Sequence, residues 1–186
     1  SATQPYGGLG GAVSSILKFK MENGAVLRVT SSAQNASPIN FIGDDGGVII
    51  AEGTLTQQKQ LYGTLLNKKG AGTMVMEQNN TSLQKLIITA GTVSALATPA
   101  NSVEMQGGTL SLTSGSSCPI TIATGKTAAV TYVDDRGSYS NKLLGDGTVT
   151  VYYPLVAGSG WYATRATLNG DWSAFKGTLK PSVVAA

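Results

Sequence analysis

The sequence predicts an all-β protein built as a parallel β-solenoid. Two observations lead to this prediction: short apolar segments recur beside Gly-Thr at nearly constant spacing, and the composition favours strands and turns over helices. Hydrophobic residues make up 41% of the 186 residues, glycine contributes 24, and charged residues only 12%. A chain of this size can form one domain with a substantial core, and we expect a single domain over 1–186.

The repeat is clearest at the glycines that directly precede threonine. The six that define the period are Gly53, Gly72, Gly91, Gly108, Gly147 and Gly177. The first four are separated by 19, 19 and 17 residues, and the next interval is about twice as long, with a degenerate copy at Gly125 near its midpoint. A fixed period of about 19 residues indicates a repeat architecture, and the spacing typical of helical repeats is missing. Short strands that meet at glycine corners and stack coil on coil give a parallel β-solenoid.

Alternate residues after each glycine are expected to point into the coil. The predicted interior column contains Leu55, Met74, Val93, Leu110 and Val149. The matching outward column contains Thr54, Thr73, Thr92, Thr109 and Thr148. Because neighbouring strands lie about 4.8 Å apart, each set should stack residue upon residue along the solenoid. Each glycine should occupy a corner that needs either a positive φ or close packing.

The two ends of the chain are less regular than its middle. Residues 1–24 are interpreted as an N-terminal cap, with a strand or short helix over 13–21. Residues 25–30 alternate as a strand, and 35–45 indicate a loop. The last interval of the repeat, from Gly147 to Gly177, is clearly longer than one period, which predicts an irregular insertion or cap at 152–176.

Charge and cysteine content exclude several classes of protein. The net charge is only +3, and the basic residues are scattered rather than arranged in a stripe, so a nucleic-acid partner is not expected. No apolar run approaches the roughly 18 residues of a membrane span, so no direct membrane span is predicted in this chain. The single cysteine, Cys118, permits no internal disulfide and is interpreted as a small buried side chain.

Several segments resemble the autotransporter-associated β-strand repeat. They are Lys-Lys-Gly-Ala-Gly-Thr-Met-Val-Met at 68–76, Asn-Thr at 80–81, Leu-Ile-Ile-Thr-Ala-Gly-Thr-Val at 86–93, and the similar units at 141–151 and 170–179. The resemblance covers roughly 65–179. It implies a right-handed parallel β-helix of the pectin-lyase-like kind, in which each coil corresponds to one period of about 19 residues. It also implies a segment of a longer exported bacterial protein, secreted or at the cell surface, that acts mainly as a stalk or scaffold.

The residue inventory argues against catalysis. The chain contains no histidine, which excludes Ser-His-Asp and Cys-His catalysis and the usual zinc sites. The pairs Asp44-Asp45 and Asp134-Asp135 could bind calcium or share acid-base work. However, adjacent strand residues face opposite sides, and both pairs lie beside glycine in expected turns. We therefore expect no enzyme, no catalytic residue, no cofactor and no metal. A carbohydrate-active β-helix enzyme, a polysaccharide lyase or hydrolase, is the alternative.

Aromatic residues are concentrated near the C-terminal end and supply the candidate site. Tyr153, Trp161, Tyr162 and Trp172 are the candidates for binding a glycan or a protein partner. The alternative is that these rings close the open end of the solenoid. The expected function is an extracellular structural scaffold or an adhesin-like bacterial surface segment. Its partners would be cell-surface glycans or proteins, with end-to-end or homo-oligomeric contacts also considered.

The outward threonines suggest a more remote alternative. Four segments each present two hydroxyl groups on one face of a strand: Thr54-Leu-Thr56, Thr92-Val-Ser94, Thr109-Leu-Ser111 and Thr148-Val-Thr150. Flat two-column hydroxyl arrays occur on ice-binding β-solenoids. Val75 and Lys126 interrupt the two columns.

Overall fold

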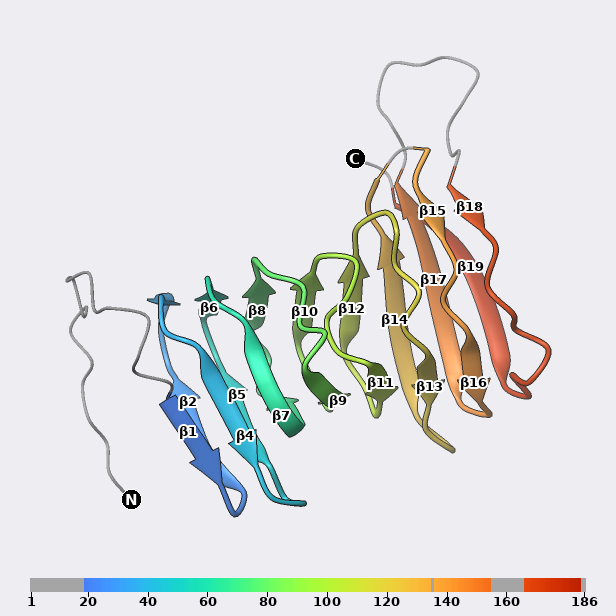
Figure 1. Cartoon of the computed structure of the whole chain (residues 1–186). Coiled ribbons are helices and arrows are strands. Elements are labelled where there is room, and N and C mark those ends of the chain that lie inside the picture. Colours follow the sequence, from blue (N-terminus) through green and yellow to red (C-terminus); the bar gives the residue numbers. More distant parts are fainter. Residues whose placement is uncertain (1–18, 135, 155–165, 185–186) are drawn as a thin grey trace.

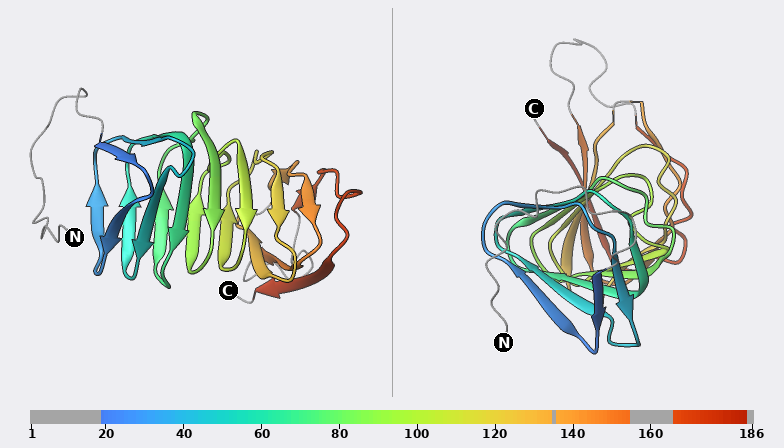
Figure 2. Two further views of the ribbon diagram at one scale, coloured as in Figure 1. Left: turned by 90° about the horizontal axis from the view of Figure 1, so that it is seen from below. Right: turned by 60° about the vertical axis from the view of Figure 1, so that its left-hand side comes forward.

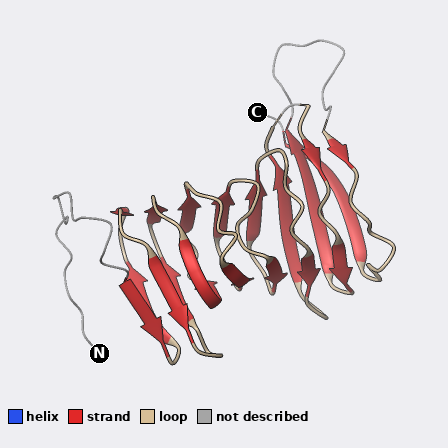
Figure 3. Cartoon of the chain, in the orientation of Figure 1, coloured by secondary structure: helices blue, strands red, loops and turns tan. Residues whose placement is uncertain are grey.

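The computed structural model describes residues 19–134, 136–154 and 166–184. These residues form strands and the loops that join them, without a helix (Figure 3). Every strand ladder among them is parallel, and the coils stack into a β-solenoid of about seven turns (Figures 1 and 2). The predicted all-β, parallel solenoid fold is therefore confirmed.

Two long sheets form the walls of the solenoid. Among the described residues the first sheet contains β1 (Phe19–Glu22), β4 (Ile39–Ile42), β7 (Leu61–Lys69), β9 (Leu83–Ile88), β11 (Ser102–Met105), β13 (Ile120–Ile122) and β16 (Leu143–Gly145), with β2 (Ala25–Val29) paired to β5 (Gly47–Ala51) and β5 to β7. The second sheet contains β3 (Ala33–Asn35), β6 (Thr54–Gln57), β8 (Thr73–Met76), β10 (Thr92–Ala95), β12 (Thr109–Leu112), β14 (Thr127–Tyr132), β17 (Thr148–Pro154) and β19 (Thr178–Val184). A third pair joins β15 (Ser138–Tyr139) to β18 (Thr167–Leu168).

The interior column of the second sheet follows the repeat as far as β12. Its members pair in the order Leu55, Met74, Val93 and Leu110. Each is at most 2% exposed. Burying a side chain of this kind stabilises the fold by about 1.5–3 kcal/mol, so the column is a main source of stability. This part of the prediction is confirmed.

The column changes register at β14, and here the prediction was wrong for Val149. Leu110 pairs with Val130, and Val130 pairs with Val151, while Val149 pairs with Ala128. The reason is the length of the strand before the column. Leu110 is the second residue of β12, whereas Val130 is the fourth residue of β14 and Val151 the fourth of β17. The outward column shifts equally: Thr148 pairs with Thr127 rather than continuing from Thr109.

The repeat glycines lie at corners for the two reasons predicted. Gly91 has a φ of 68°, a conformation that residues with a Cβ rarely adopt. Gly72 has no positive φ, but a Cβ there would overlap the carbonyl oxygen of Gly53 on the preceding coil. Both glycines therefore let the chain turn sharply against the coil beneath it.

The N-terminal coils differ from the others in their first sheet. β1 and β2 are joined by Asn23 and Gly24, both with positive φ, whereas β7 runs through the equivalent region as one strand. The expected strand at 25–30 is observed as β2. The expected loop at 35–45 was wrong in its middle, because β4 occupies Ile39–Ile42 and pairs with both β1 and β7. Residues 1–18 of the expected cap lie outside the described residues, and residues 19–22 form β1.

The C-terminal segment adds a further coil. β17 continues to Pro154, residues 155–165 lie outside the described residues, and the chain then forms β18 beside β15. Phe175 makes an isolated bridge to Gly145, after which β19 pairs with β17 along its whole length. The described parts of 152–176 thus continue the stack, with a loop between β18 and β19 that lies against β16.

Candidate functional site

Three tyrosines form a cluster inside the C-terminal coils. Tyr132 of β14 lies 4.3 Å from Tyr139 of β15 and 6.4 Å from Tyr153 of β17, measured between ring centroids. Tyr132 and Tyr139 are buried, and Tyr153 is partly buried against the core. Burial raises the pKa of all three phenols. Tyr153 therefore belongs to a packed aromatic cluster.

Trp172 lies in the loop between β18 and β19. Its indole ring is half-buried against the core, and its Nε1 donates a hydrogen bond of 3.0 Å to the carbonyl oxygen of Asn141. The next turn is closed by a hydrogen bond from the backbone N–H of Phe175 to the carbonyl of Trp172. Trp161 and Tyr162 lie outside the described residues. Tyr153 and Trp172 thus lie in different parts of the C-terminal coils. Tyr153 is on β17, and Trp172 is in the loop between β18 and β19, bonded to Asn141.

A buried polar cluster surrounds the side chain of Asn141, the residue whose backbone carbonyl accepts the Trp172 hydrogen bond. The amide Nδ2 of Asn141 donates to Ser116 Oγ at 2.9 Å and to the carbonyl oxygen of Cys118 at 2.8 Å. Asn141 Oδ1 is buried with no hydrogen-bond partner among the described residues. Cys118 is 6% exposed, which confirms its expected burial. Burial raises the pKa of its thiol to about 11, so the reactive thiolate is suppressed at neutral pH.

Asp44, Asp45 and Asp134 lie outside the strands, in the turn regions expected from the sequence. Asp44 and Asp45 are exposed in the loop between β4 and β5. Asp134 accepts a hydrogen bond from the backbone N–H of Ser114, which gives it a structural role, and Asp135 lies outside the described residues. Within the described ranges, no three His, Cys, Asp or Glu side chains are grouped so that they could hold a metal ion.

Lys68 is a buried cation that the sequence analysis did not single out. It occupies an interior position of β7, between Ile49 and Ile88 on the neighbouring strands. Its Nζ donates to the carbonyl oxygens of Gly70, Gly72 and Ala90, at 2.5–2.9 Å. Burial lowers its pKa to about 8. The signal was present in the sequence, because this lysine begins the Lys-x-Gly-x-Gly segment of the repeat.

The outward hydroxyl columns are in register across four strands. Thr54, Thr73, Thr92 and Thr109 form one column, and Thr56, Val75, Ser94 and Ser111 form the other. Ala129 follows Thr109 on β14. Lys126 precedes β14 and is not a member of either column, so that expected interruption was misplaced. The result is a partly buried sheet face with hydroxyls at seven of eight positions.

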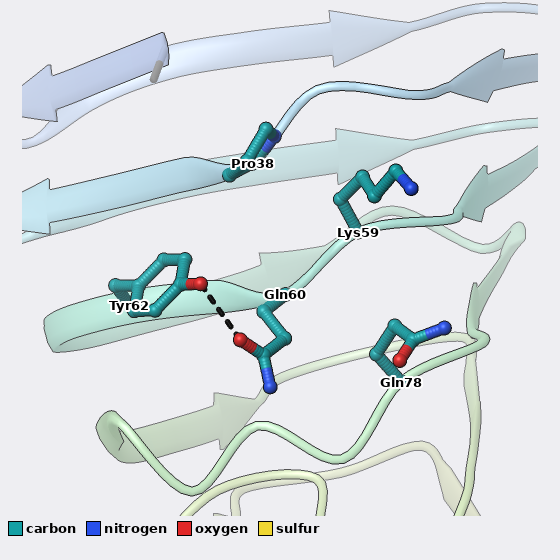
Figure 4. A pocket seen from close by; sticks show the side chains of 5 residues that line it. All are labelled: Pro38, Lys59, Gln60, Tyr62 and Gln78. Atoms are coloured by element: carbon teal, nitrogen blue, oxygen red, sulfur yellow. Dashed lines mark hydrogen bonds between the residues drawn. The ribbon is translucent and has the colours of Figure 1, made fainter. Parts of the chain in front are cut away.

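A shallow hollow lies where three successive coils turn into the first sheet. Pro38, Lys59, Gln60, Tyr62 and Gln78 line it, and its volume is about 220 Å³. In Figure 4 the Tyr62 hydroxyl points at Gln60, with Pro38 and Lys59 on one side and Gln78 on the other. Sequence reasoning missed this hollow because its residues come from separate coils.

The fold and these features define the chain as a parallel β-solenoid protein. No protein-family model, curated protein or solved structure matches the sequence or the fold. None of the described segments forms a helix that is long and apolar enough to cross a membrane.

Proposed function

We propose that this chain is a structural scaffold segment of a secreted or bacterial cell-surface protein, of the autotransporter-associated repeat type. The observation that carries the proposal is the unbroken parallel pairing from β6 to β17, with buried side chains stacked beneath these strands. In such a solenoid each coil is stabilised by its neighbours, and the stack forms an elongated support. An adhesin-like segment needs such a support to hold a contact surface away from its anchor.

The corners support the same proposal. Lys68 binds carbonyl groups on its own coil and on the next one, and the glycine corners permit close approach of successive coils. These devices tie coil to coil and stiffen the stack. The corner carbonyl groups form hydrogen bonds within the solenoid rather than with a ligand, which suits a mechanical role.

The contact surface of this scaffold is proposed to lie near the C-terminal coils, with surface glycans or proteins as partners. The candidates Tyr153, Trp161, Tyr162 and Trp172 remain a prediction. Trp172 is half-buried and hydrogen-bonded to Asn141, which favours a closing role for this ring. Binding at this end would then depend on Trp161 and Tyr162.

The rival function, a polysaccharide lyase or hydrolase, is tested by turnover. The purified chain is incubated with uronate-containing and neutral glycans, with and without calcium, and new reducing ends or unsaturated products are measured. A scaffold gives no turnover. Reproducible cleavage that is lost in Asp134→Asn and retained in the control Asp146→Asn would overturn the scaffold proposal.

Ice binding is a second candidate, favoured by the in-register hydroxyl columns on β6, β8, β10 and β12. Adjacent members are spaced by the strand separation of about 4.8 Å, which gives a regular array. The test is thermal hysteresis of the chain against Thr92→Tyr, a bulky change at the centre of the face. Activity in the parent that is lost in this variant supports ice binding; no hysteresis in the parent excludes it.

A further inference from the structure

The hollow around Tyr62 combines an aromatic ring with side chains that can form several hydrogen bonds. Tyr62 follows the buried Leu61 on β7 and therefore faces outward, half-buried, beside Asn40 of β4. Gln60 and Lys59 precede the same strand, Pro38 comes from the coil before, and Gln78 from the coil after. Three consecutive coils thus contribute to one small surface.

The central side chain of the hollow is held in place before any ligand binds. Gln60 Oε1 accepts a hydrogen bond of 2.7 Å from the Tyr62 hydroxyl, and its Nε2 donates to the carbonyl oxygen of Asn79 at 3.3 Å. Its backbone carbonyl accepts a hydrogen bond from Ile39 on the preceding coil. A surface whose groups are already oriented loses less entropy on binding.

We propose that this hollow binds one pyranose ring of a neutral glycan. The apolar face of a sugar packs on an aromatic ring, and its hydroxyls pair with amide groups, which Gln60 and Gln78 supply. The volume of about 220 Å³ is below the roughly 300–1,000 Å³ of typical ligand pockets, so it suits a single ring. Lys59 also lines the hollow, and its ammonium group can donate a hydrogen bond to a sugar hydroxyl, so a neutral ring uses every polar group of the lining.

This inference goes beyond the scaffold function, because the stack of coils is complete without a ligand at Tyr62. It also places a glycan contact away from the C-terminal aromatic residues. Tyr153 and Trp172, the described members of that group, lie on other coils than Tyr62, so Tyr62 can be replaced without altering them.

The experiment uses the full chain and an array of neutral oligosaccharides built from glucose, galactose, mannose and N-acetylglucosamine. The best-bound oligosaccharide is then titrated, and its dissociation constant is measured for the parent and for variants. Tyr62→Ala should weaken binding about tenfold or more, and Gln78→Ala, an exposed change, should weaken it several-fold. Tyr62→Phe should bind between the parent and Tyr62→Ala, because it keeps the ring and loses the hydroxyl that bonds to Gln60.

The matched control is Gln84→Ala, which removes another exposed glutamine, from β9 on the first sheet and outside the lining of the hollow. It should bind like the parent. The proposal is overturned if the parent binds none of the oligosaccharides at millimolar concentration, or if Tyr62→Ala and Gln78→Ala both bind like the parent. Thermal melts of every protein report on the scaffold separately, since loss of binding with an unchanged melt leaves the solenoid intact.

Discussion

The Nζ atom of Lys68 donates a hydrogen bond of 2.9 Å to the carbonyl oxygen of Ala90, one coil further along the solenoid. Two more bonds from the same atom reach Gly70 and Gly72 on its own coil. A single ammonium group therefore satisfies three corner carbonyls inside an otherwise apolar column. Loss of hydration disfavours the charged form of this ammonium group, and its hydrogen bonds to the three carbonyl oxygens offset part of that cost.

The first prediction concerns the pH dependence that Lys68 causes. Burial lowers its folded pKa from 10.5 to about 8, so between these values the unfolded chain binds more protons than the folded one. The free energy of unfolding contributed by Lys68 should then rise with pH from about 8 to 10.5, and be constant below that window. Urea denaturation of the parent and of Lys68→Met across this window and down to neutral pH measures the difference.

Lys68→Met removes the titrating group and leaves three carbonyls without their donor. It should lower the free energy of unfolding by about 1–3 kcal/mol at neutral pH, and the gap to the parent should widen once the pH exceeds the folded pKa. Lys69→Met is the matched control, because Lys69 is exposed on the same strand. A constant gap across the whole pH range would contradict the assigned window.

The second prediction separates backbone strain from close packing at the corners. Gly91 and Gly125 have nearly equal φ values of 68° and 67°. A Cβ at Gly91 would overlap Lys68 Nζ and the carbonyls of Gly70 and Gly72, whereas a Cβ at Gly125 would meet no atom within 4 Å. Gly125→Ala should therefore cost about 1–2 kcal/mol from strain alone, and Gly91→Ala clearly more.

Chemical denaturation of both alanine variants at neutral pH checks this pair. Because the φ values match, the difference between the two variants measures the close approach of coils at Gly91. Equal destabilisation would mean that the coils can separate at this corner without cost.

The third prediction treats Trp172 as a ring that closes the C-terminal coil. Trp172→Phe keeps most of the packing and loses the hydrogen bond to Asn141, so it should cost about 0.5–1.5 kcal/mol. Trp172→Ala should cost more, though less than the roughly 3–5 kcal/mol of a fully buried aromatic, because the ring is only half-buried. Thermal and urea unfolding of both variants measure these effects. If Trp172→Ala kept full stability but lost glycan binding, the ring would be a binding residue instead.

The sequence was sufficient for the fold because the Gly-Thr period recurs where the chain turns. Each glycine marks a corner, and the residue two positions later points inward, which correctly predicted the register from Leu55 to Leu110. The register prediction failed at Val149 because β14 has two additional residues before its member of the interior column. The degenerate unit at Gly125 contains no sequence feature that indicates these two residues.

The candidate sites were less predictable than the fold. Tyr132 and Tyr139 are distant from Tyr153 in sequence, so the packed cluster they form emerges only when the coils stack. Lys68 had a visible motif, but a lysine in an interior column contradicts the usual pattern until its three carbonyl partners are known. Tyr62 became a candidate only because Pro38 and Gln78, from the coils on either side, lie beside it.

The final prediction concerns the reactivity of Cys118. The thiol is 6% exposed, and burial raises its pKa to about 11, above the usual 9.0. In the folded protein at mildly alkaline pH it should therefore react with a thiol reagent orders of magnitude more slowly than in urea. In urea the thiol is exposed to the reagent and its pKa returns to the usual value. Asn141 connects this thiol to the closing ring, since its Nδ2 donates to Cys118 Sγ at 3.5 Å and its backbone carbonyl accepts the bond from Trp172 Nε1. Trp172→Ala should loosen this contact and speed labelling of Cys118, while Trp172→Phe should do so less.

Two outcomes would contradict this prediction for Cys118. Labelling that is equally fast in the folded and unfolded parent would refute the buried position of the thiol. Labelling that is unchanged in Trp172→Ala would show that the ring does not protect it.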